Sequence, residues 1–192
     1  MKSAIGSSST NFCAVSKRND PHGWNSLDNY IQVHERRIAD FIAEGFIIND
    51  GLVRDWPTPH TILIKGRNYC DHGLFLDVEK YLEVIDSGSG SKWVRTDTYG
   101  YHGGIEGDQD RAIFRYDNFH VYEREGHRDA HHRHRFEHDT WQEIEPPEWI
   151  GAERWPHLSD AIAELRGWWE TIGRFLDLDT SHPNITRDPS NS

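Results

Sequence analysis

The residues best suited to acid–base or metal chemistry are concentrated in one stretch, residues 115–138. Six of the thirteen histidines fall between His120 and His138. An unperturbed imidazole titrates near pH ~6.5, so a histidine can accept or donate a proton at neutral pH. Five arginines accompany them: Arg115, Arg124, Arg128, Arg133 and Arg135. The stretch is interpreted as a catalytic site, a metal site or a solvated basic edge.

Alternation along two predicted strands divides these residues between faces. A strand over 129–137 places successive side chains on opposite sides of a sheet. A second strand over 111–118 does the same for the residues before the cluster. The side chains that share a face are His132 with His134 and Phe136, His131 with Arg133 and Arg135, Arg115 with Asp117, and Phe114 with Tyr116. If the two strands pair, these groups converge.

This set of residues suits cleavage of a phosphodiester without a metal or other cofactor. One histidine takes a proton from a ribose 2′-hydroxyl, a second protonates the leaving oxygen, and arginine stabilises the charged phosphorane. The predicted catalytic residues are His131, His132, His134, Tyr116 and Asp117. The predicted substrate-binding residues are Arg115, Asn118, His120, Arg133 and Arg135.

Two other interpretations fit the same residues. One alternative is a metal-binding hydrolase, because the ligand types of His132, His134, His120 and Asp117 suit zinc or another divalent metal. Their spacing matches no standard closed zinc motif. An exposed histidine-rich strand without chemistry is the third reading, and it corresponds to a non-enzymatic interaction module.

The overall charge restricts the partners. A net charge of -11 argues against a protein that coats nucleic acid. A basic island on an acidic body favours a localised anion site, with RNA as a predicted partner. Cys13 and Cys70 form no metal-type pair and predict free thiols in a reducing cytoplasm. No apolar run is long enough to predict a membrane span.

The periodicity predicts one α+β domain over 24–178, between a disordered leader (1–23) and a disordered tail (179–192). A helix capped by Ser26 runs to about Ala43, and a second helix begins at Leu158 with Ser159 as its cap. Between them, residues 46–56 predict a short hairpin. Further strands are predicted over 61–70, 74–85, 92–102, 111–118 and 129–137. Short connections favour an antiparallel meander of four to six strands with both helices packed on it.

Three segments read RYDNFH (115–120), HHRHRF (131–136) and EWIG…WPHLSDAIAELRGWW (148–169). Together they resemble the TumE-like toxin family of toxin–antitoxin systems, over roughly residues 58–172. The resemblance implies a small α+β toxin-like protein with a helix-turn-helix antitoxin as partner. The positions carried over as site residues are Tyr116, Asp117, Asn118, His131, His132 and His134.

The ribonuclease activity is inferred from the histidine and arginine chemistry and not from the resemblance. The chain departs from shorter members of the family by its added N-terminal helix and leader and by its larger number of histidines. The expected function is therefore a cytoplasmic toxin-like component, acting as a metal-independent endoribonuclease.

Overall fold

The structure is a computed structural model, and it describes residues 23–88, 90–107, 110–119 and 130–178. The predicted tail, and the predicted leader except for its last residue, lie outside the described residues. Two helices are present in the described part of the chain, α1 (Leu27–Ala43) and α2 (Leu158–Thr171). The strands are β1 (Asn25–Ser26), β2 (Ile47–Asp50), β3 (Val53–Thr58), β4 (Thr61–Cys70), β5 (Leu74–Asp86), β6 (Lys92–Ile105), β7 (Arg111–Asp117), β8 (His132–Arg135) and β9 (Glu148–Trp149).

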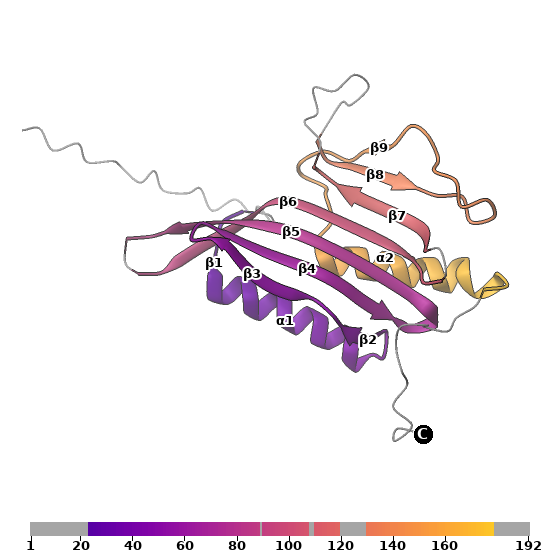
Figure 1. Cartoon of the computed structure of the whole chain (residues 1–192), viewed down its shortest axis with the longest axis horizontal. Helices are drawn as coiled ribbons and strands as arrows, with labels where there is room; N and C mark the ends of the chain where they lie inside the picture. The colour runs from indigo at the N-terminus through magenta and orange to yellow at the C-terminus, as the bar shows by residue number, and fades with distance from the viewer. Residues whose placement is uncertain (1–22, 89, 108–109, 120–129, 179–192) are drawn as a thin grey trace, which may run out of the picture.

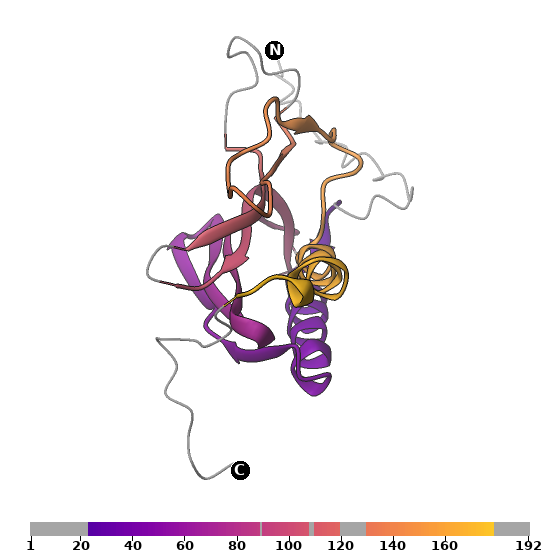
Figure 2. The same cartoon turned by 90° about the vertical axis from the view of Figure 1, so that its right-hand side faces the viewer.

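All of these strands belong to one antiparallel sheet (Figure 1). Its order is β2-β4-β5-β6-β7-β8-β9, with β3 beside β4 and β1 beside β6. Both helices lie on the same side of the sheet, as the end view in Figure 2 shows. The α+β class with two packed helices is therefore confirmed. The sheet has nine strands because short edge strands, including β1 and β9 of two residues each, extend the predicted meander.

Period-two alternation on β5 and β6 produces the core between the sheet and the helices. Leu74, Leu76 and Val78 of β5 all point toward the helices and are buried. On α2, Ile162 and Leu165 are fully buried against this layer. A register shift between Tyr81 and Leu82 marks a bulge where β5 pairs with β6. The alternation of β5 continues through it, because Lys80, Leu82 and Val84 are all buried. The other side of the sheet has no helix over it, and we call it the open face.

The helix starts differ in how well the sequence predicted them. Ser26 caps α1 as predicted, and its hydroxyl accepts a hydrogen bond from the Asn29 amide. For α2 the predicted cap was wrong: His157 is the N-cap, and its backbone N–H donates to Asp160. The hydroxyl of Ser159 instead accepts a hydrogen bond from Arg37 on α1.

The hairpin predicted over residues 46–56 is also wrong. β2 and β3 do not pair with each other; both pair with β4, β2 along its end and β3 along its beginning. The two strands form one interrupted edge of the sheet. Between them the chain stays close beside β4 at Gly51, whose amide donates to the Arg67 carbonyl at 3.0 Å. Gly66 lies at this close approach and has a φ of +139°.

Gly66→Ala should unfold the edge of the sheet. A Cβ at Gly66 would lie 2.2 Å from the Gly51 carbonyl oxygen, and the positive φ adds strain. We expect the free energy of unfolding to fall by about 2 kcal/mol or more in urea denaturation. The control is Gly167→Ala in α2, where a Cβ meets nothing within 4 Å and stability should be kept or slightly increased. Equal stability of the two variants would contradict this account of the close approach between Gly51 and Gly66.

Candidate metal centre

The pairing of β7 with β8 decides which predicted residues meet. Arg115 lies opposite His134, and Asp117 lies opposite His132. Residues directly opposite in an antiparallel pair project to the same face of the sheet. All four side chains therefore project to the open face, within one short section of two strands.

The same register continues across the sheet as a polar row. Arg115 lies opposite His102 on β6, and His102 lies opposite Asp77 on β5. Asp77 lies opposite Arg67 on β4 and accepts hydrogen bonds from its Nε at 2.7 Å and its Nη2 at 2.8 Å. The site is therefore one end of a line of charged and titratable side chains that spans five strands.

His132 is fully buried, and its hydrogen bonds define its tautomer. Nδ1 lies 2.9 Å from the Ala130 carbonyl oxygen. A carbonyl oxygen can only accept, so Nδ1 carries the proton. Nε2 then faces Asp117, with 3.1 Å between Nε2 and Oδ1.

His134 has the same arrangement. Its Nδ1 donates to the carboxylate of Glu143, and its Nε2 lies 2.9 Å from Nη2 of Arg115. A guanidinium group has no acceptor, so Nε2 of His134 presents its lone pair. Glu143 reaches this position because residue 136 forms a β-bridge with residue 143, which returns the chain alongside β8.

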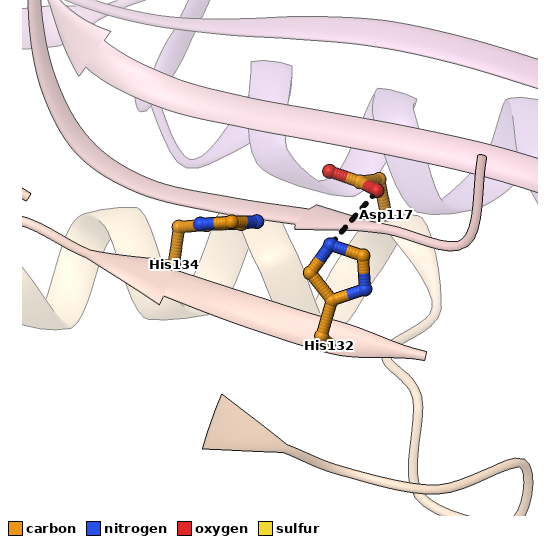
Figure 3. A group of neighbouring side chains, drawn as sticks. All are labelled: Asp117, His132 and His134. Atoms are coloured by element: carbon orange, nitrogen blue, oxygen red, sulfur yellow. Dashed lines mark ion pairs between the residues drawn. The ribbon is translucent and has the colours of Figure 1, made fainter. Parts of the chain in front are cut away.

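Two imidazole Nε2 atoms and one carboxylate consequently converge (Figure 3). The potential ligand atoms of Asp117, His132 and His134 all lie within 4.8 Å of one another, and all three residues are buried. Histidine ligands of metals usually donate their second ring nitrogen to a carbonyl or carboxylate, which orients the ring. Ala130 and Glu143 supply these two acceptors.

Arg115 occupies the entrance of this group. Its Nε donates to Asp117 Oδ2 at 3.1 Å while its Nη2 donates to His134. Its side chain is 40% exposed, whereas that of Asp117 is 4% exposed. Arg115 is therefore the member of the group that can turn away into solvent, while the three buried side chains are held in place.

Charge also favours ionised forms here. Burial alone raises the pKa of Asp117, but its hydrogen bond to His132 and the charges of His132 and Arg115 outweigh this effect and lower that pKa. Burial works against a charged His132, yet the hydrogen bond and charge of Asp117 raise its pKa. Each member of the buried pair therefore favours the charged form of the other.

A cavity of about 400 Å³ opens beside this group on the open face. Arg115 and Asp117 line one side of it, and His102 and Asp77 line another. Gly100 lies opposite Asp117 on β6. Its missing side chain leaves room for the ring of Phe119, which a Cβ at Gly100 would meet at 2.4 Å.

Tyr116 and Arg133 lie on the other face, toward α2. The Tyr116 hydroxyl donates to Glu164 of α2 at 2.6 Å, and Arg133 forms an ion pair with the same carboxylate. The guanidinium of Arg133 also lies over the Tyr116 ring, 5.4 Å from its centroid. These two residues attach the β7–β8 pair to the helix, and the sheet separates them from Asp117.

The remaining predicted residues also lie away from Asp117. His131 packs against the rings of both Tyr99 and Trp155, which also stack on each other, on the helix side. Asn118 accepts a hydrogen bond from the Tyr99 amide and donates to the Asp97 carbonyl, so it binds the end of β7 to β6. Arg135 is exposed on the side opposite His134. His120 lies outside the described residues.

Sequence reasoning missed Glu143 as the partner of His134. Nothing in the neighbouring sequence indicated this role, because the position of Glu143 depends on how residues 139–144 return along β8. Asp77 was detectable only through the register, which no spacing along the chain reveals.

No protein-family model, curated protein sequence or solved structure matches this chain. In the described part of the chain, no helix combines the length and apolarity needed to cross a membrane. The proposals below therefore depend on the geometry of the site itself.

Tyr116→Phe should weaken the fold without affecting the open face. Removing the hydroxyl deletes a part-buried hydrogen bond to a charged acceptor, so we expect a loss of about 1–2 kcal/mol in the free energy of unfolding. Tyr81→Phe is the matched control, because its hydroxyl also donates to a glutamate, Glu79, but at the exposed surface. If both variants lose the same amount in urea denaturation, the anchoring role of Tyr116 is wrong.

Proposed function

We propose that this protein is a metal-dependent hydrolase, with a centre formed by Asp117, His132 and His134. One observation carries the proposal. Both histidines have Nδ1 committed to an acceptor, which leaves both Nε2 atoms directed at the space beside a buried carboxylate. A histidine pair used only as a solvated surface needs neither burial nor this shared orientation.

Two imidazoles and one carboxylate suit Zn²⁺ and neighbouring divalent transition metals. Three protein ligands leave coordination positions for water and substrate, as in catalytic rather than structural zinc sites. A metal held there would lower the pKa of a bound water and polarise a substrate oxygen. The chain itself supplies the rigid ligands, their two orienting acceptors and the adjoining cavity.

Arg115 supports an anionic substrate. When a metal takes over Asp117 and His134, the guanidinium loses both acceptors and faces the cavity, where His102 lies beside it. Arginine pairs with phosphate in a planar, two-pronged contact. We therefore propose a phosphodiester as the substrate class, with Arg115 binding the phosphate.

A second proposal keeps the toxin-like protein with a helix-turn-helix antitoxin that the resemblance implies. To it we add the metal-independent endoribonuclease activity expected from the histidine and arginine chemistry. One observation favours it over a bare metal site: His102 and Arg115 line the same cavity and are both partly exposed. His102 would then act in proton transfer and Arg115 would bind phosphate. RNA cleavage that survives chelation and is lost in His102→Gln would support it over the metal centre.

Titration with Zn²⁺ followed by calorimetry, on protein purified without a histidine tag, tests the metal centre. We expect about one site per chain, which His132→Ala/His134→Ala abolishes. The matched control is His60→Ala/His138→Ala, which removes two exposed histidines and should leave the site intact. Equal zinc binding by both double variants would contradict the proposed ligands.

Two single substitutions should shift the zinc affinity in opposite directions. Glu143→Gln removes the carboxylate that orients His134, so affinity should fall about 10–100-fold. Arg115→Met removes a cation that occupies two ligand atoms, so zinc should bind more tightly while hydrolysis of a phosphodiester such as bis(p-nitrophenyl) phosphate is lost. Arg135→Met, an exposed arginine on β8, should change neither quantity. Weaker zinc binding in Arg115→Met would overturn its assignment as the displaced group.

A further inference from the structure

A second cavity, of about 260 Å³, lies on the helix side of the sheet between α1 and α2. Its lining is rich in basic and hydroxyl side chains: Tyr30, His34, Arg37, Lys80, His157 and Ser159. The first turn of α2 borders it, so the positive end of that helix faces the cavity. The open-face site lies across the sheet, and the two are independent.

Lys80 is the unexpected residue in this lining. It projects from β5 toward the helices, in the same layer as Val78 and Leu82, and is only 5% exposed. Buried lysines are rare unless a carboxylate accompanies them. Within the described residues no carboxylate forms an ion pair with Lys80. Its neighbours are the hydroxyls of Tyr30 and Tyr101 and the face of the Tyr30 ring, 5.2 Å from Nζ.

Those neighbours leave hydrogen-bonding capacity unused. The buried Tyr101 hydroxyl lies beside Lys80 and, among the described residues, makes no hydrogen bond of ordinary geometry. The Tyr30 hydroxyl is 3.4 Å from the Thr96 hydroxyl, a weak contact. Burial works against the charged ammonium, yet the oxygens of Tyr101 and Tyr30 raise the pKa of Lys80, so hydroxyl groups and not a carboxylate hold its charge.

Burial and the charge of Lys80 both act on the two histidines beside the cavity. Burial lowers the pKa of His34 to about 4, and the charges of Lys80 and Arg54 add to the effect. Burial also lowers the pKa of His157, aided by Lys80 and Arg37 and opposed by Asp160. Asp160 is the one acid among these influences, and its carboxylate already accepts the His157 backbone N–H at 2.9 Å.

We propose that this cavity binds a small oxoanion, a phosphate or carboxylate group, with Lys80 as its buried charge partner. The ammonium donates to the anion from the sheet, and the first turn of α2 and Arg37 face it from the helices. The volume is sufficient for a group of that size. Because the anion contacts both helices, its binding stabilises their packing on the sheet.

Binding of inorganic phosphate and of acetate, each against chloride at equal ionic strength, tests the proposal in the full chain. Thermal unfolding and calorimetry are run on wild type, Lys80→Met and Lys65→Met, the last removing an exposed lysine of β4. We expect phosphate or acetate to raise the Tm of wild type and Lys65→Met. Lys80→Met should bind at least about tenfold more weakly and, without anion, should be no less stable than wild type. The anion with the larger effect identifies the recognised group.

An NMR titration keeps the test decisive if Lys80→Met does not fold. An anion beside His34 and His157 raises the pKa of both imidazoles, and Arg37→Gln should weaken that response. Arg115→Met should not change it, which separates this cavity from phosphate bound at the open face. Unchanged imidazole pKa values in saturating phosphate and acetate, or equal phosphate binding by Lys80→Met and wild type, would overturn the proposal.

Discussion

The site depends on the register between β7 and β8. Because side chains alternate with a period of two, a slip of one residue would move Asp117 away from His132 and place the arginines of β8 on the open face. Two attachments hold the register. On the helix side, Tyr116 and Arg133 converge on Glu164 of α2. On the open face, the ion pair of Asp117 with His132 and the contacts of Arg115 lock the same four positions.

The ionisable groups of residues 115–138 lie on two faces of the sheet, and the groups on each face have a different role. The helix-side groups are satisfied by one another and by α2, so their contribution is to stability. On the open face, the Nδ1 atoms of His132 and His134 are held by Ala130 and Glu143. This leaves the two Nε2 atoms directed at one point. Buried polar groups held in this way are favourable only when a partner completes them, and here Arg115 is that partner.

Much of the fold followed from the sequence. The extents of β4 and β5 and the start and cap of α1 were predicted because each depends on local alternation or helical period. The same alternation separated His132 and His134 from Arg133 and Arg135. The prediction of a hairpin over 46–56 was wrong because the close approach of Gly51 to Gly66 keeps both β2 and β3 paired with β4.

The sequence predicted the convergence of His132 and His134 with Asp117 only on the condition that the two strands pair. It could not supply the pairing register or the returning loop that brings Glu143 to His134. The central claim, that Asp117, His132 and His134 bind a metal, is tested most directly by crystals grown with one equivalent of Zn²⁺, using anomalous scattering at the zinc edge. The account predicts one strong peak at about 2.0–2.1 Å from Nε2 of His132 and of His134, with a carboxylate oxygen of Asp117 as third ligand and Arg115 displaced. A map without a peak there, or with zinc on the Nδ1 atoms or on other histidines, would contradict it.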